Sequence, residues 1–213
     1  MNVSSTIGVL ALQGAFAAHL DLLSSLDVVG RPVRLPRDLE GLDGLILPGG
    51  ESTTMSNLLR SYDLLGPLNE FISAGHPVFG TCAGMILLSD RILDGRADQI
   101  ALKSIDIVVR RNGYGRQVDS FETDIDVDGF DSAFHFDSAF HAVFIRAPRI
   151  EEVGPDVDVL ARHEGVPVLV RQGTVMAASF HPELTNDDRI HRLFADMVRD
   201  ASSSGVTSRD QVR

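Results

Sequence analysis

Short apolar runs alternate with amphipathic segments along the first half of the chain. Residues 6–12 (TIGVLAL) predict a buried strand, and Gly14 ends it. A helix is predicted next, because Phe16, His19, Leu20, Leu23 and Leu26 recur at helical spacing. A strand followed by a helix is one βα unit, and successive units of this kind build a parallel sheet.

The strand-then-helix order continues toward the middle of the chain. Strands are predicted at residues 32–35, 44–48 and 77–80, with helices at residues 53–65 and from about Ala83. Each strand ends in a loop that contains glycine. Such loops gather at the carboxyl edge of an open α/β sheet, where ligands bind. We therefore expect any functional site to lie at that edge.

The second half is richer in paired strands, which predicts a mixed sheet. Strands are expected at residues 105–110, 143–146, 157–161, 166–170 and 175–180. One amphipathic helix is expected at about residues 187–200, after the acidic stretch that suits a helix N-terminus. We expect one domain over residues 1–200, followed by a flexible tail at residues 201–213.

Composition and charge narrow the class of partner. The chain has 213 residues and a formal net charge of -11, which disfavours nucleic acid, since phosphate backbones need clustered cations. No apolar run is long enough to span a bilayer, and the N-terminus lacks a basic signal-peptide start. We therefore expect a cytoplasmic protein with no membrane or nucleic-acid partner. The single cysteine excludes an internal disulfide and a cysteine-based metal cluster.

A tandem hexapeptide, FDSAFH, occupies residues 130–135 and again 136–141. One extra copy cannot stack a repeat core, so we interpret it as an enlarged loop without new chemistry. His135 and His141 are conceivable metal ligands, but copies of one motif need no such role. No metal and no cofactor are expected.

The only cysteine lies in the segment 79–85 (FGTCAGM), between a predicted strand and a predicted helix. Gly80 and Gly84 flank Cys82 at two residues on each side, which is the pattern of a nucleophile elbow with sulfur in place of oxygen. The helix dipole would favour a thiolate there. The motif alone is weak, because free cysteines are more often buried and inert.

Two further segments strengthen the interpretation of Cys82 as a nucleophile. The segment 47–52 (LPGGES) offers backbone N–H groups where an oxyanion could bind, although it could also be a plain turn capped by Ser52. The segment 180–183 (FHPE) places His181 and Glu183 on one side of an extended backbone. Glu183 could then orient His181, which would take the proton of Cys82.

The combination PGGES, GTCAG and SFHPE resembles the class I (triad) glutamine amidotransferases. The fuller strings LALQGAF, LILPGGESTT, VFGTCAG, GRQVDSFE, VFIRAP and FHPELT are similar to the glutaminase subunit of pyridoxal 5'-phosphate synthase, the PdxT/SNO family. The match runs from about Ile7 to Val198. It implies an α/β fold: a single-domain, flavodoxin-like open mixed sheet with helices on both faces.

The resemblance also implies roles for individual residues. Cys82 would be the nucleophile, with His181 and Glu183 as the relay, and the backbone of Gly50 and Ala83 would form the oxyanion hole. Gln13 and Gly14 match the family's turn beside the active site, near the place where the synthase subunit docks. The positions that correspond to the family's L-glutamine-binding residues are Gly50, Glu51, Ser52, Arg111, Ile145 and Arg146.

The activity implied by the resemblance is hydrolysis of L-glutamine to L-glutamate and ammonia. The ammonia would pass to a separate (β/α)8-barrel synthase subunit in a hetero-oligomer, for vitamin B6 biosynthesis. Departures from the family pattern are the polar stretch at residues 94–104 and the doubled hexapeptide before Arg146.

Three alternatives remain open at this stage. The chain could be the glutaminase of another synthase, such as that of imidazole glycerol phosphate formation, although GRQVDSF and FIRAP disfavour this. It could be a catalytically silent relative that acts as a binding module. A DJ-1-like cysteine hydrolase shares the elbow but does not need His-Pro-Glu after the last strand.

Overall fold

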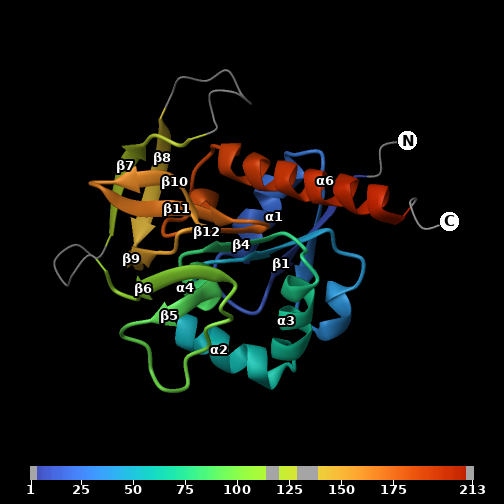
Figure 1. The fold of residues 1–213 in the computed structure, drawn as a ribbon, viewed down its shortest axis with the longest axis horizontal. Helices are drawn as coiled ribbons and strands as arrows, with labels where there is room; N and C mark the ends of the chain where they lie inside the picture. Colours follow the sequence, from blue (N-terminus) through green and yellow to red (C-terminus); the bar gives the residue numbers. More distant parts are fainter. Residues whose placement is uncertain (1–3, 114–119, 129–138, 210–213) are drawn as a thin grey trace.

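The computed structural model describes residues 4–113, 120–128 and 139–209. Its centre is a seven-stranded sheet in the order β10-β11-β12-β4-β3-β1-β2 (Figure 1). The strands from β12 to β2 run parallel, whereas β10 and β11 pair antiparallel at one edge. The bounds are β1 Thr6–Leu10, β2 Val29–Val33, β3 Gly44–Leu47, β4 Val78–Thr81, β10 Asp158–His163, β11 Val166–Gln172 and β12 Val175–Ala178.

Helices cover both faces of this sheet, and alternation along the strands explains why. In β3, Leu45 and Leu47 pack in one apolar cluster while Ile46 packs in the other. Figure 1 shows α6 on one side of the sheet and α2 and α3 on the other. The helices are α1 Phe16–Ser24, α2 Ser52–Ser61, α3 Leu65–Ser73, α4 Ala83–Leu88 and α6 Arg189–Arg209, with short 3-10 helices η1 Pro36–Leu39 and η2 Pro182–Leu184.

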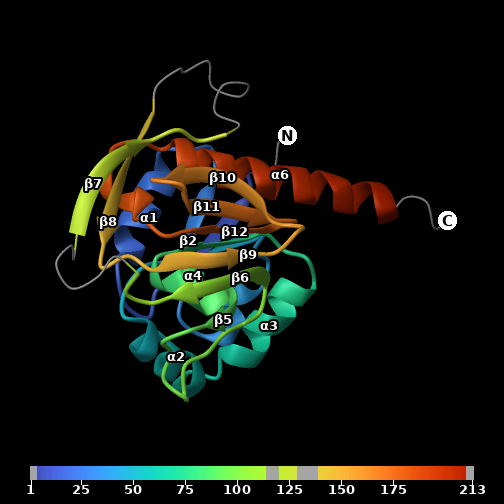
Figure 2. The same cartoon turned by 60° about the vertical axis from the view of Figure 1, so that its left-hand side comes forward.

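Two small sheets flank the central one. One has the order β5-β6-β9, with β5 Ser89–Ile92, β6 Ile105–Arg110 and β9 Arg149–Val153. The other pairs β7 Ser120–Ile125 with β8 Phe140–Ile145, and both views show it at one end of the molecule (Figures 1 and 2). Phe140 and Phe144 of β8 pack against Phe180, which follows β12. This packing holds the end of β8 beside the carboxyl edge of the central sheet.

The predicted α/β class and mixed sheet are confirmed, and most differences lie at element ends. The single helix predicted at residues 53–65 is wrong: α2 ends at Ser61, and α3 begins at Leu65. Asp63 between them takes a φ of 54°, which interrupts the helical backbone. Elements β5, β7, β9 and α3 were missed.

The C-terminal helix also differs from the prediction. The helix is predicted to end near Asp200, but α6 continues to Arg209. The mobility of the remaining tail stays a prediction. Most of the FDSAFH duplication (residues 130–138) lies outside the described residues. The same is true of most of the GRQVDSFE string (residues 115–119). Within the described ranges, none of the helices is both long and apolar enough to cross a bilayer.

Candidate active site

Cys82 occupies a sharp turn between β4 and α4. Its φ of 48° and ψ of −104° lie outside the usual regions for a side chain with a Cβ, and its N–H donates to the carbonyl of Ala178 at 2.8 Å. The flanking glycines are required sterically. A Cβ on Gly84 would lie 1.9 Å from the carbonyl oxygen of Leu47, and a Cβ on Gly80 would lie 2.6 Å from the backbone of Gly84. The turn therefore has the geometry of a nucleophile elbow.

His181 and Glu183 follow β12 and are both buried. The N–H of His181 donates to the carbonyl of Val143 in β8 at 2.8 Å, which fixes this segment beside the elbow. Nδ1 of His181 lies 2.7 Å from Oε1 of Glu183. Burial lowers the pKa of His181, but hydrogen bonds with Cys82 and Glu183 outweigh burial and raise that pKa to about 10. The imidazolium form is thus favoured next to the sulfur.

The loop that contains Gly49 and Gly50 closes over these side chains. A Cβ on Gly49 would lie 2.3 Å from Cε1 of His181 and 3.3 Å from Cβ of Cys82. Gln13 holds the loop from behind: its Nε2 donates to the carbonyl of Glu51 at 3.1 Å, and its Oε1 accepts from the N–H of Glu51 at 3.2 Å. Gln13 therefore lies against the loop that borders the cleft, and its nearness to a partner stays a prediction.

Glu51 begins α2 and carries a negative charge into the site. Its carboxylate accepts from the N–H groups of Thr53 and Thr54. Burial raises the pKa of Glu51, but these hydrogen bonds prevail and lower that pKa to about 2. Oε1 of Glu51 also lies 3.2 Å from Nη2 of Arg111. The N–H of Arg111 in turn donates to Oδ1 of Asp94 at 2.7 Å, so the polar stretch at residues 94–104 helps to place this arginine.

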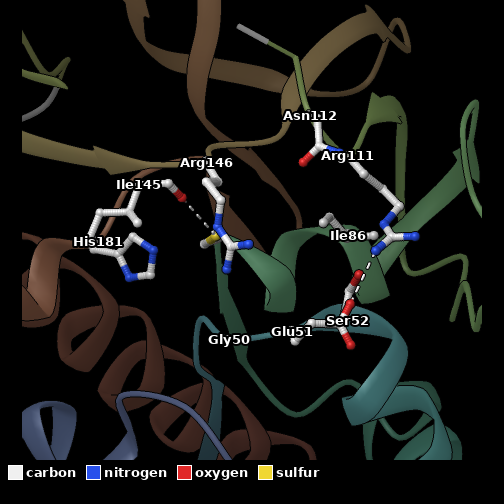
Figure 3. A pocket seen from close by; sticks show the side chains of 10 residues that line it. Gly50, Glu51, Ser52, Ile86, Arg111, Asn112, Ile145, Arg146 and His181 are labelled. Atoms are coloured by element: carbon white, nitrogen blue, oxygen red, sulfur yellow. Dashed lines mark hydrogen bonds and ion pairs between the residues drawn. The ribbon is translucent and has the colours of Figure 1, made fainter. Parts of the chain in front are cut away.

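These side chains surround a cleft of about 160 Å³ (Figure 3). The six positions expected to bind glutamine all line it, together with Cys82 and His181. Ile86 and Asn112 also line the cleft and were missed, although Ile86 follows Cys82 by one helical turn and Asn112 adjoins Arg111. The lining residues are Gly50, Glu51, Ser52, Cys82, Ile86, Arg111, Asn112, Ile145, Arg146 and His181.

The end of β8 supplies the opposite wall of the cleft. The sulfur of Cys82 lies 4.0 Å from the carbonyl oxygen of Ile145. Arg146 takes a φ of 43°, which turns the chain away from β8 at this point. Its side chain lines the same cleft as Cys82 (Figure 3). Strained backbone therefore occurs on both sides of the cleft, at Cys82 and at Arg146.

The remaining predicted positions lie close by. Ala83 is the first residue of α4, so its N–H has no acceptor within the helix and adjoins Cys82. Gly14, with a φ of 84°, approaches Gly49 so closely that a Cβ would lie 1.9 Å from the carbonyl oxygen. In the part of the chain that the structure describes, no cluster of three His, Cys, Asp or Glu side chains could hold a metal ion.

Comparison with known proteins agrees with this geometry. The model of the SNO glutamine amidotransferase family matches residues 9–200. A pyridoxal 5'-phosphate synthase subunit PdxT of Mycobacteroides abscessus is 56% identical over 197 residues, which cover 92% of this chain and 99% of the relative. A protein of the same name from Streptomyces coelicolor is 53% identical over 199 residues, with 93% and 96% covered.

A solved structure described as a glutamine amidotransferase has the same fold. Its TM-score is 0.83 at 47% sequence identity, and the match covers 90% of this chain and 98% of that one. The family match spans nearly the whole described sheet, including the elbow, the Gly49–Gly50 loop and the His181–Glu183 segment. The chain therefore belongs to the SNO glutamine amidotransferase family.

Proposed function

We propose that this protein is the glutaminase subunit of a pyridoxal 5'-phosphate synthase and that it hydrolyses L-glutamine to L-glutamate and ammonia. The observation that carries the proposal is the arrangement of Cys82 on a strained elbow, in the same cleft as a buried His181–Glu183 pair. The relatives named PdxT, more than half identical to this chain, support the pathway.

The first chemical step is attack by the Cys82 thiolate on the side-chain amide carbon of glutamine. His181 carries the proton, and Glu183 holds the imidazole by its Nδ1–H. The tetrahedral oxyanion is stabilised by the N–H groups of Gly50 and Ala83. His181 then gives its proton to the departing ammonia. Water hydrolyses the thioester, and this releases glutamate and restores the thiolate.

Charged groups of the cleft bind the amino-acid end of the substrate. Arg111 and Arg146 are suited to the α-carboxylate, because guanidinium groups form paired charge-assisted hydrogen bonds with it. Glu51 stays ionised near neutral pH, since its pKa is about 2, and suits the α-ammonium group. The exposed ion pair between Glu51 and Arg111 would thus open to admit glutamine.

The ammonia is passed to a (β/α)8-barrel synthase subunit within a hetero-oligomer. Gln13 and Gly14 brace the loop over the site, so a partner that docks beside them could act on that loop directly. A cytoplasmic location stays a prediction. No observation favours a second candidate function over this one.

The test is glutamate release by the purified protein, with and without a cognate synthase subunit. Wild-type protein with the synthase is expected to release glutamate, while Cys82→Ala is expected to lose release to background. Glu70→Gln, an exposed change on α3, is the matched control and should behave as wild type. Wild-type turnover by Cys82→Ala would refute the proposal. Activity only with the synthase of another pathway would support the alternative partner.

A further inference from the structure

Two buried histidines, His19 and His191, lie on the side of Glu183 that faces away from the cleft. The mechanism above does not use them. His19 lies on α1 and His191 on α6, and both side chains are fully buried. Nδ1 of His19 lies 2.8 Å from Nε2 of His191. Nε2 of His19 lies 3.3 Å from Oγ1 of Thr81, the residue before Cys82. Segments far apart in the chain therefore converge directly beneath the elbow.

The second carboxylate oxygen of Glu183 faces this pair. Oε1 is occupied by His181, whereas Oε2 is buried and makes no standard hydrogen bond among the described residues. Nε2 of His19 lies 3.4 Å from Oε2, but the ring is not aligned for a hydrogen bond with it, and the same Nε2 also contacts Oγ1 of Thr81. A buried carboxylate oxygen without a donor is costly, so an N–H at this position is strongly favoured.

The contacts select one tautomer for each ring. If His19 carries its proton on Nε2, it donates toward Glu183, and its Nδ1 accepts from Nε2–H of His191. The opposite tautomer would place a lone pair of His19 against the carboxylate. It would also leave a buried N–H without an acceptor on His191, whose Nδ1 has no partner in the described part of the chain. The first arrangement is therefore preferred.

Charge states agree with this chain of donors. Burial, with smaller contributions from His191 and His181, lowers the pKa of His19 well below its usual value. Burial also lowers the pKa of His191 to about 4. Both rings are thus neutral near pH 7, and they add a donor to Glu183 without cancelling its negative charge.

We propose that His19 is a positioning residue for the hydrolysis, with His191 fixing its tautomer. In this arrangement His191 donates to His19, His19 to Glu183 and His181 to the other oxygen of Glu183. The inference rests on the proposed function, because it assigns Glu183 to the relay that serves Cys82. Its effect is to fix the carboxylate, and hence the imidazole of His181, relative to the sulfur.

Two substitutions of His19 separate positioning from packing. In His19→Gln the amide nitrogen can reach the place of Nε2 and still donate to Glu183, whereas in His19→Asn the amide reaches only the place of Nδ1. We expect His19→Asn to lower kcat by on the order of 10- to 100-fold, with KM within about threefold, because the relay is misplaced. His19→Gln should recover most of that loss. His76→Asn, at a ring that stacks on Phe71 outside the site, is the control.

A second readout does not need glutamine or a synthase. Iodoacetamide alkylates cysteine thiolates directly, so the alkylation rate of Cys82 reports how His181 is placed in the cleft. The alkylation rate at pH 7 should fall in His19→Asn and recover in His19→Gln. If wild-type protein releases no glutamate, the proposed function fails, yet the alkylation rates still test the role of His19. The inference would be overturned if His19→Asn and His19→Gln had the same kcat and the same alkylation rate. It would also be overturned if His19→Asn raised KM without lowering kcat.

The ring of His191 offers an independent test if the His19 variants do not fold. His191→Leu removes the donor to Nδ1 of His19, whereas His191→Gln can retain one. We expect a smaller loss of kcat in His191→Leu, of about threefold to tenfold, and its recovery in His191→Gln. A Leu variant as active as wild type, with an unchanged alkylation rate, would contradict the proposed chain.

Discussion

The cleft on one side of Glu183 and the buried pair His19–His191 on its other, closed side contain the same residue type in opposite charge states. On the cleft side, His181 is buried, yet hydrogen bonds with Cys82 and Glu183 raise its pKa to about 10. On the closed side, burial prevails and lowers the pKa values of His19 and His191. Burial alone therefore does not decide the charge of an imidazole. At His181 the hydrogen bonds with Cys82 and Glu183 outweigh burial, whereas at His19 and His191 burial prevails.

The two sides also respond to pH with opposite signs. His181 has a raised pKa in the folded state, so its stabilising contribution is present below about pH 6.5 and is lost as pH rises through about 10. His191 has a lowered pKa, so it costs nothing above about pH 6.5. Its cost grows as pH falls toward about 4, because the unfolded chain binds a proton that the folded protein excludes.

Glu183 lies between His181 and His19, and its replacement should lower kcat more than any other substitution considered. A carboxylate accepts from His181 and from His19, whereas the amide of Glu183→Gln can accept on one side only. We expect kcat to fall by on the order of 10³- to 10⁴-fold, as when the orienting acid of a triad is made neutral. Synthase-coupled glutamate release measures this. A loss below about tenfold would contradict the relay.

Acid unfolding should isolate the closed side. As pH falls from 6.5 to about 4, exclusion of a proton from His191 is expected to remove about 3 kcal/mol from the free energy of unfolding. Urea unfolding at several pH values measures the slope. His191→Leu should flatten it, while His76→Leu should leave it unchanged. An identical slope in wild type and His191→Leu would show that His191 is not excluded from protonation.

Arg111→Met should affect only the cleft side, and its effect on glutamine hydrolysis should be smaller than that of Glu183→Gln. Loss of a charged partner for the substrate carboxylate is expected to raise KM by about 10- to 100-fold with little change in kcat. Stability should change by only about 0 to 1 kcal/mol, because the pair with Glu51 is partly exposed. Arg91→Met, which breaks an exposed pair with Glu152, serves as the control. An unchanged KM would remove Arg111 from the glutamine site.

Local sequence predicted the cleft well, because its parts are short motifs. The elbow at Cys82 and the pair His181–Glu183 each depend on residues a few positions apart, so their geometry follows from strand ends and glycine positions. The polar chain behind them could not be predicted in this way. His19 fitted an apolar helical spacing, and only the tertiary fold brings it to His191 and Glu183.

Errors in the predicted elements have similar causes. Apolar spacing across residues 53–65 continued through Asp63, whose positive φ could not be inferred from that spacing. Strands β5 and β9 each contain two consecutive exposed residues and form only a small flanking sheet, so their apolar pattern is weak. The extension of α6 beyond Asp200 runs through serine and glycine, which have low helix propensity.

Covalent labelling of Cys82 tests the central claim most directly. The complex with the synthase would be incubated with a glutamine-mimicking electrophile, 6-diazo-5-oxo-L-norleucine, and the adduct located by mass spectrometry. The account predicts one adduct, on Cys82, that excess glutamine prevents and that Cys82→Ala lacks. Hydrolysis of glutamine that continues while Cys82 stays unlabelled, or equal labelling of the Cys82→Ala protein, would contradict it.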